Sequence, residues 1–311
     1  MYSKILVTGC GGDIGLAIGK ILKDTKNYVS IIGCDITADH AGKYIFDQCC
    51  IVDKADSENY IKTLLNIIEK EKVDVVIPTS EQELRLLCEK KFFGMNNLFL
   101  APNLRAMEIG FDKLATAEML KTAELPYPKT KIITCSMPDK FPCIVKSRAG
   151  CGSKDVIVVE DYEAFEDIKR TRPNDIWQEY LLPEDQEYTC GVYRASDNDI
   201  RTIIMKRKLK GGCTGSGIVV ENNEINKVLH KIAEVLDLKG SINVQLRLTD
   251  HGPVVFEINP RFSSTVGFRH KMGFQDVVWA LNEKKGLSLL PFSPVEEGIR
   301  FYRIYDDIVF N

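Results

Sequence analysis

The chain has 311 residues, of which 44% are hydrophobic and 27% are charged, so it can bury a sizeable core in two or three lobes. Its formal net charge is -3, with acidic and basic residues interspersed along the sequence. A nucleic-acid backbone or an anionic bilayer requires a concentrated basic surface, so neither is expected as a partner. Small-molecule chemistry is therefore favoured.

The N-terminal residues and the cysteines both indicate a reducing compartment. The chain enters an apolar strand pattern at once, without the charged leader, longer apolar run and cleavage site of a secretory signal. Ten cysteines are scattered with no C-x-x-C pair, and adjacent Cys49 and Cys50 are poorly placed to bridge each other. We expect a cytoplasmic protein with reduced thiols that mostly fill the core.

Strand and helix patterns alternate in the first third of the chain. An apolar run at 4–8 leads through a glycine turn into apolar residues at helical spacing. Further strands are predicted at 28–35 and 74–80, separated by an amphipathic helix at 57–72. Such alternation predicts an α/β lobe, Rossmann-like, with a parallel sheet and helices on both faces. Its end is expected near residue 104, because Pro102 and Asn103 precede a new helix.

The remainder of the chain has closely spaced strands joined by tight turns, which favours antiparallel pairing. Helices are predicted at 112–123 and 223–238. Strands are predicted at 141–147, 155–159, 176–182, 186–194, 199–209, 240–248 and 253–259. The fold class is therefore α/β followed by α+β.

Gly9, Gly12 and Gly15 lie between a predicted strand and helix, and Asp35 follows 20 residues after the last glycine. This pattern is typical of a dinucleotide site, because glycines let the backbone approach an anion at a helix N-terminus. Any carboxylate or phosphate would satisfy the same geometry, and a tight turn that only starts the helix remains an equal alternative.

A short-chain-type, NAD-dependent oxidoreductase is the corresponding alternative function. It requires a tyrosine and a lysine four residues apart on one helix, and Tyr127 and Lys131 have that spacing. Pro126 and Pro128 flank the tyrosine, and a strand pattern follows directly, so one helical face cannot be assumed. The NAD interpretation is therefore not favoured.

Two alternating strands around a D-H-G-P turn carry the most informative motif. Strict alternation places Asn243, Gln245 and Arg247 on one face of the first strand, and Val255, Glu257 and Asn259 on one face of the second. The opposite, apolar face is predicted to comprise Ile242, Val244, Leu246, Val254, Phe256 and Ile258.

Gln245 must lie near Glu257 if both bind one metal, so directly opposed residues are expected to sum to 502. A three-residue connection at 250–252 follows from that register. Carboxylate and carboxamide oxygens suit Mg2+ held jointly with nucleotide phosphates. Arg261 can present its guanidinium to a transferring phosphoryl group.

The E-I-N-P-R motif after an N-V-Q strand resembles the ATP-grasp superfamily. In motif style the chain is similar to a single synthetase half of the carbamoyl-phosphate synthase large subunit, a carboxylate-amine ligase type of enzyme. Residues 1–104 resemble the family's preATP-grasp lobe and residues 105–311 its ATP-grasp module. The small ATP-lid subdomain is expected at about 115–182 and the catalytic subdomain at about 183–311.

The resemblance implies an ATP site with Lys113 and Lys146 beside the phosphates and a flexible glycine loop folded over the nucleotide. The adenine edge would be read by a hinge, the ribose by an acid, and the metal by the hairpin. The positions so implied for ATP are Lys113, Lys146, Gly150, Gly152, Ser153, Glu179, Tyr180, Leu181, Glu187 and Gln245. The metal positions are Gln245, Glu257 and Asn259, for Mg2+ or its substitute Mn2+, and the catalytic residues are Arg261 and Lys146.

The implied reaction activates a small carboxylate as an acyl phosphate and passes it to an amine in an ADP-forming ligation. Closure of the glycine loop would exclude water from that intermediate. Candidates for the substrate cleft are Gly11, Gly12, Arg207, Thr214, Ser263 and Arg269. A homodimer is a possible assembly.

Two other functions remain open at this point besides the oxidoreductase. One is a carbamoyl-phosphate-synthase-like kinase or ligase fragment, although the chain has length for one synthetase half and no glutaminase region. The other is a non-catalytic nucleotide sensor, against which Lys146, Glu257, Asn259 and Arg261 argue. Only Glu257 among the three metal positions is anionic, so the phosphates are expected to supply much of the charge that holds the metal.

Overall fold

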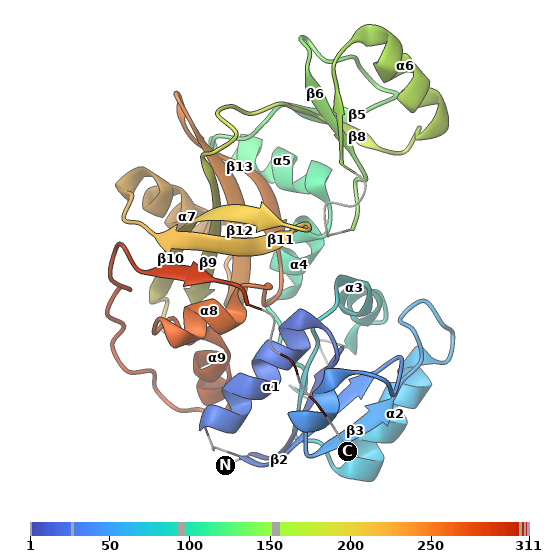
Figure 1. The fold of residues 1–311 in the computed structure, drawn as a ribbon, viewed down its shortest axis with the longest axis vertical. Coiled ribbons are helices and arrows are strands. Elements are labelled where there is room, and N and C mark those ends of the chain that lie inside the picture. Colours follow the sequence, from blue (N-terminus) through green and yellow to red (C-terminus); the bar gives the residue numbers. More distant parts are fainter. Residues whose placement is uncertain are drawn as a thin grey trace.

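The computed structural model describes residues 2–25, 28–92, 98–150, 156–304, 307 and 309. Three sheets organise these residues into an N-terminal lobe, a lid and a large central sheet. Figure 1 shows the N-terminal lobe in blue at one end of the molecule and the lid in green at the other, with the large sheet beside both. The fold is mixed α/β, as the sequence predicts.

The N-terminal lobe is a parallel sheet of four strands in the order β3-β2-β1-β4. The strands are β1 (Tyr2–Thr8), β2 (Tyr28–Asp35), β3 (Gln48–Ile51) and β4 (Val75–Ile77). The helical segments are α1 (Asp13–Thr25), the short 3-10 helix η1 (Ala41–Tyr44), α2 (Tyr60–Glu71) and α3 (Glu81–Glu89).

The side chains of β1 alternate between two apolar cores. Ile5 and Val7 pack with Ile18 of α1, whereas Leu6 packs with Leu64 of α2 and Leu87 of α3. Helices therefore cover both faces of the sheet, which confirms that prediction.

The lid is an antiparallel sheet in the order β5-β8-β6-β7 with one helix on it. Its elements are β5 (Thr130–Ile132), β6 (Cys143–Lys146), β7 (Ile157–Val159), α6 (Tyr162–Thr171) and β8 (Ile176–Glu179). Phe165 and Trp177 are both buried between the helix and the sheet, so the lid has its own small core.

The large sheet has the order β13-β12-β9-β10-β11-β14 and is antiparallel throughout, as predicted. Its strands are β9 (Glu187–Arg194), β10 (Ile200–Lys210), β11 (Cys213–Val219), β12 (Gly240–Thr249), β13 (Gly252–Asn259) and β14 (Arg300–Tyr302). Its helices are α4 (Leu104–Gly110), α5 (Lys113–Thr122), α7 (Asn223–Val235), α8 (Val266–Lys271) and α9 (Asp276–Lys284).

Two helix layers cover this sheet. On one face, Ile232 of α7 shares a core with Val192 and Val244. On the other, Trp279 of α9 shares a core with Tyr193, and that core continues into the N-terminal lobe. The polar strand positions that remain uncovered form the candidate site.

The β12–β13 hairpin has the predicted register only in the half that contains Gln245 and Glu257, away from the turn. Gln245 pairs with Glu257, as expected. A β-bulge follows Gln245 and shifts the pairing, so that Thr249 pairs with Gly252. The predicted three-residue connection at 250–252 is therefore wrong, because only two residues separate the paired ends, and Gly252 with φ of +103° begins β13.

The bulge also exchanges two side chains between the faces of β13. Val255 pairs with Leu246 and is fully buried in the core. Phe256 instead lines a cavity beside Glu257. Strict alternation predicts the opposite placement of Val255 and Phe256, and that prediction is wrong because a bulge inserts one residue and changes the face of those beyond it.

Among the helices that the structure describes, none is long and apolar enough to cross a membrane. The cysteines in the described ranges are free thiols, and four of them are buried: Cys10, Cys34, Cys143 and Cys190. Five other described cysteines are partly or fully exposed, so the expectation that the cysteines mostly fill the core is wrong for the described residues.

Candidate functional site

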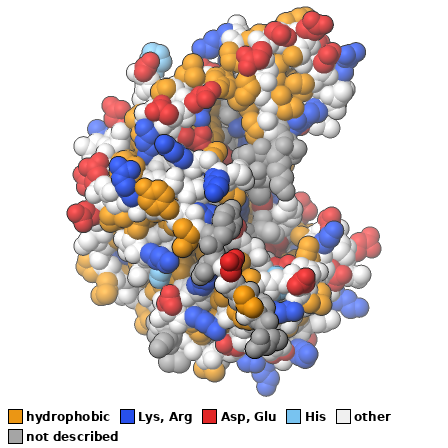
Figure 2. All heavy atoms as spheres, viewed as in Figure 1, with side chains coloured by type: hydrophobic (Ala, Val, Ile, Leu, Met, Phe, Trp, Pro, Cys, Tyr) orange, Lys and Arg blue, Asp and Glu red, His pale blue; other side chains and the backbone are white. Residues whose placement is uncertain are grey.

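A cavity of about 300 Å³ lies between the lid and the large sheet. Figure 2 shows the molecule hollowed on the side where the lid overhangs the N-terminal lobe. Most of the predicted ATP positions in the described chain line the cavity, and two of the metal positions do so as well. The predicted residues in its lining are Lys113, Lys146, Gly150, Glu179, Tyr180, Leu181, Glu187, Arg207, Gln245 and Glu257. Gly152 and Ser153 lie outside the described residues.

Lys146 ends strand β6 and is only 7% exposed. Its Nζ donates a hydrogen bond to Gln178 Oε1 on the neighbouring strand at 2.7 Å and lies 5.7 Å from the centre of the Phe256 ring. Burial lowers the pKa of Lys146 to about 8, against the attraction of Glu257. A partly desolvated ammonium group of this kind binds an anionic phosphate more strongly than a fully hydrated one.

Lys113 begins helix α5, whose N-cap is Asp112. The Asp112 carboxylate accepts hydrogen bonds from Arg148 at the start of the glycine loop, so it ties that loop to the helix. Lys113 Nζ donates to the carbonyl of Gly150 at 2.5 Å. Lys113 therefore enters the cavity from helix α5, and Lys146 enters it from strand β6 of the lid.

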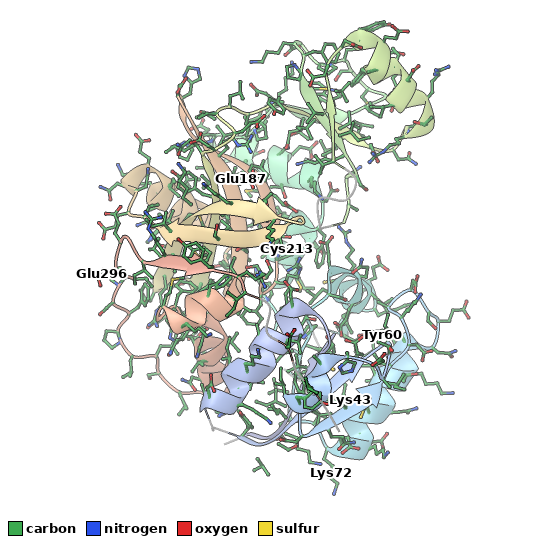
Figure 3. The ribbon with its side chains drawn as sticks, in the orientation of Figure 1. Lys43, Tyr60, Lys72, Glu187, Cys213 and Glu296 are labelled. Carbon is green, nitrogen blue, oxygen red and sulfur yellow. The ribbon has the colours of Figure 1, made fainter. Side chains whose placement is uncertain are left out.

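Glu187 stands at the start of β9, and both of its carboxylate oxygens are engaged. Arg207 donates two hydrogen bonds to Oε1, at 2.9 and 2.6 Å, and Arg247 donates one to Oε2 at 2.6 Å. Figure 3 labels Glu187 at the end of the large sheet nearest the lid. A carboxylate has further lone pairs, so Glu187 is held in place and can still accept hydrogen bonds from ribose hydroxyls.

Arg247 also donates to the carbonyl of Leu181 at 2.6 Å, which links Glu187 to the segment that follows β8. Strand alternation places Arg247 on the polar face, but the sequence motifs assign it no role. Gln178, which orients Lys146, and Phe256 are likewise additional cavity residues. Arg247 pairs directly with Glu187 on the adjacent strand, so a polar residue opposite a predicted site position is the signal that could have identified it.

The metal positions are arranged in two layers. Gln245 and Glu257 are directly paired on neighbouring strands and both line the cavity. Gln245 Oε1 accepts a hydrogen bond from Arg207 at 2.9 Å, whereas the Glu257 carboxylate has no hydrogen-bond or ion-pair partner among the described residues. Asn259 is 5% exposed, pairs with Asn243 and does not line the cavity. A free carboxylate beside a carboxamide suits a hard cation such as Mg2+.

Arg261 lies in a second cavity of about 240 Å³, between the N-terminal lobe and helix α9. Its guanidinium donates to the Phe262 carbonyl at 3.0 Å. Lys239, Glu283 and Lys284 line the same cavity, so Arg261 shares it with charged side chains of both signs.

Three of the candidate substrate residues are buried in internal contacts. Arg269 is fully buried and paired with the equally buried Asp276 at 2.6 Å. Ser263 donates to Asn243 at 3.0 Å, and Thr214 is 1% exposed. None of the three lines either cavity, whereas Arg207 does.

The glycine turn at 9–15 is occupied by side chains of its own lobe. The Gly11 N–H donates to the Asp35 carboxylate at 2.8 Å, and the Gly12 N–H donates to the Gly9 carbonyl at 3.0 Å. A Cβ on Gly11 would lie 2.6 Å from the Cβ of His40, so the histidine packs directly on the turn. Asp35 therefore receives a backbone hydrogen bond here.

Comparisons with known proteins match both parts of the chain. Residues 111–265 match the model of the ATP-grasp domain, and residues 5–95 match that of the PylC-like N-terminal domain. The carbamoyl phosphate synthase large chain of Clostridium acetobutylicum is 24% identical over 236 residues. The match covers 68% of this chain but only 22% of that protein, about a fifth of its length.

Solved structures share the fold over nearly the whole chain. The N5-carboxyaminoimidazole synthetase of Staphylococcus aureus has a TM-score of 0.73 and 19% identity, over 95% of this chain and 80% of that one. The L-amino acid ligase of Bacillus licheniformis has a TM-score of 0.70 and 16% identity, over 91% and 74%. With its two family matches, this fold and the cavity that gathers the motif residues, the chain belongs to the ATP-grasp superfamily.

Proposed function

We propose that the protein is a Mg-ATP-dependent ligase that activates a small carboxylate as an acyl phosphate and joins it to an amine, releasing ADP and phosphate. The observation that carries this proposal is the convergence of two lysines, a fixed acid and a free carboxylate on one cavity, in Lys113, Lys146, Glu187 and Glu257. The family relationship supports ATP-dependent ligation, and two solved relatives are named as a synthetase and an amino acid ligase.

The cavity has a polar end and an apolar end that match the two ends of a nucleotide. Lys113 and Lys146 neutralise phosphate charge, while Ile144 and Leu209 line an apolar part suited to a base. The hinge at 179–181 offers backbone groups to the adenine edge, and Glu187 accepts from the ribose. Arg261 is assigned to the substrate side, because it lines the second cavity and not the one proposed for ATP.

Glu257 and Gln245 are the residues suited to hold Mg2+, since the Glu257 carboxylate is unpaired within the described chain and faces the cavity. The ion supplies neutralisation of the charge that spreads over the phosphoryl oxygens. A carboxylate is a poor electrophile until its oxygen is phosphorylated, so phosphoryl transfer precedes attack by the amine.

The reaction class is tested without knowing the natural amine. The full chain is incubated with Mg-ATP, a panel of amino acids and sugar acids, and a high concentration of hydroxylamine, which intercepts acyl phosphates as hydroxamates. We expect carboxylate-dependent ADP release accompanied by hydroxamate. Release of AMP and pyrophosphate would instead show adenylation, and the proposed mechanism would be abandoned.

A further inference from the structure

Two cysteines and a histidine cluster at the carboxyl end of β1, outside the cavity of the candidate site. The ligand atoms of Cys10, His40 and Cys49 all lie within 4.8 Å of one another. Cys10 Sγ is 3.7 Å from His40 Nε2. Cys10 is fully buried, whereas His40 and Cys49 are partly exposed. His40 is the N-cap of the short helix η1, and Lys43 of that helix is labelled in Figure 3.

The fold brings the two sulfur atoms together across an intervening strand. Cys10 follows β1 and Cys49 belongs to β3, with β2 between them. Gly33 of β2 pairs in register with Cys49. A Cβ on Gly33 would lie 2.7 Å from both the Cβ and the Sγ of Cys10. The Cys10 side chain therefore crosses β2 at a residue that has no side chain.

The hydrogen bonds of His40 favour a role beside a reactive cysteine over a role as a metal ligand. The Gly42 N–H donates to His40 Nδ1 at 3.1 Å. A neutral imidazole with Nδ1 as acceptor carries its proton on Nε2, and Nε2 faces Cys10 Sγ. A metal ion would need the lone pair of that same nitrogen. The arrangement therefore suits a ring N–H that donates to a cysteine sulfur.

We propose that Cys10 and Cys49 form a redox-active dithiol that is converted reversibly to a disulfide by exchange with a small disulfide such as oxidised glutathione. The Cys49 thiolate attacks one sulfur of the reagent and releases a first small thiolate. The Cys10 thiolate then attacks Cys49 Sγ and releases the second. The two protein thiols are oxidised, the reagent is reduced to two thiols, and the two protons pass to the released thiolates.

The positions of the two sulfurs set the order of these steps. Cys49 lies on an edge strand of four residues and is partly exposed, so the reagent reaches it first. Cys10 is buried, and burial raises the pKa of its thiol. The His40 Nε2–H is placed to stabilise the Cys10 thiolate as it forms, which makes His40 a positioning residue. The disulfide would tie the glycine turn to β3 and enclose the segment that carries η1.

The dithiol is tested on the full chain after treatment with a chelator and a reductant. The protein is equilibrated in glutathione buffers of increasing oxidised fraction, alkylated, and mapped by mass spectrometry. We expect a Cys10–Cys49 disulfide that is reversed by dithiothreitol and accompanied by a higher melting temperature, because the cross-link restricts the unfolded chain.

Two cysteine variants provide matched tests, since Cys49 and Cys50 are neighbours on the same strand. Cys49→Ser should abolish the cross-linked peptide and the gain in melting temperature, whereas Cys50→Ser should retain both. His40→Asn should slow disulfide closure without changing its position. Failure to form the Cys10–Cys49 peptide in any buffer would overturn the proposal, as would one equivalent of zinc bound to the reduced protein through His40.

Discussion

Lys146 combines a buried ammonium group with a predicted role beside the phosphates. Its pKa is lowered to about 8, below that of an exposed lysine, chiefly by burial. The unfolded chain therefore binds more protons than the folded one between about pH 8 and 10.5, so this residue's contribution to stability rises with pH in that window. Its contribution to phosphate binding instead falls as the pH rises, because the neutral amine no longer attracts an anion.

The affinity for ATP should therefore fall as the pH rises through the pKa of Lys146. Between pH 7 and 9 a single group with a pKa of about 8 goes from mostly charged to mostly neutral, so a decrease of up to about tenfold is expected. Isothermal titration of the full chain with Mg-ATP measures it. Lys146→Arg, which stays charged, should remove this pH dependence, and Lys284→Met, in the other cavity, should leave it. An unchanged profile in Lys146→Arg would contradict the assignment.

Glu257 provides the second prediction at this scale. Glu257→Gln keeps the shape of the side chain but removes the anionic metal ligand, so turnover should fall by at least about a hundredfold while the melting temperature without ligand stays nearly unchanged. The exposed Glu296, labelled in Figure 3, gives the control Glu296→Gln, which should behave like the wild type. Turnover at the wild-type level in Glu257→Gln, at low as well as at saturating Mg2+ concentrations, would remove Glu257 from the metal site.

Single residues were predictable where they belong to a motif set whose order and spacing resemble the ATP-grasp superfamily. Lys146 and Glu257 were predicted in this way, and both line the cavity. Arg247 was not assigned, because its two partners, Glu187 and Leu181, are about sixty residues away and meet it only after the strands pair. Long-range pairing of that kind leaves no local sequence pattern.

At the scale of elements, helix α3 shows a signal that was present but not used. Ser80 caps the helix by accepting from the Glu83 N–H at 3.2 Å, which is the S-x-x-E arrangement of a capping box. Strand β14 is different, because three residues at a sheet edge are too few to show a period. The bulge at Phe256 was also unpredictable, since an alternating sequence favours an unbroken strand.

Arg247 connects three elements, β12, β9 and the hinge after β8, and its role can be tested at that level. Arg247→Lys keeps one charge but cannot reach both Glu187 and the Leu181 carbonyl, so the ribose acid and the hinge should lose their fixed geometry. We expect the Kd for ATP to rise about tenfold, the equivalent of one charged hydrogen bond. Arg170→Lys on the exposed face of α6 is the control. Equal affinities in the two variants would show that Arg247 has no part in nucleotide binding.

The whole molecule joins a parallel lobe with a glycine turn to an antiparallel module with a lysine-lined cavity. The direction of strand pairing in each sheet follows from patterns that the sequence shows, since alternating strands and helices favour parallel pairing and tight turns favour antiparallel pairing. The packing of α1 of the N-terminal lobe against α8 of the large sheet does not follow from them. It depends on surface shape, for which a periodic pattern has no signal.

The glycine turn at 9–15 and the cavity under the lid are the two places considered for a nucleotide, and a comparison of ligands distinguishes them. The glycine turn has its Gly11 N–H bound to Asp35 and the His40 side chain packed against Gly11, so part of its backbone is already engaged. The cavity under the lid, by contrast, exposes Lys146 and Glu257. Mg-ATP should therefore raise the melting temperature, by the equivalent of roughly 2.7 kcal/mol at a hundredfold excess over its Kd, whereas NAD should not. Differential scanning fluorimetry with Glu257→Gln as a control for magnesium dependence makes the comparison. Equal shifts with both nucleotides would return the glycine turn to consideration as a dinucleotide site, and a shift with NAD that persists in Lys146→Met would locate the binding outside the cavity.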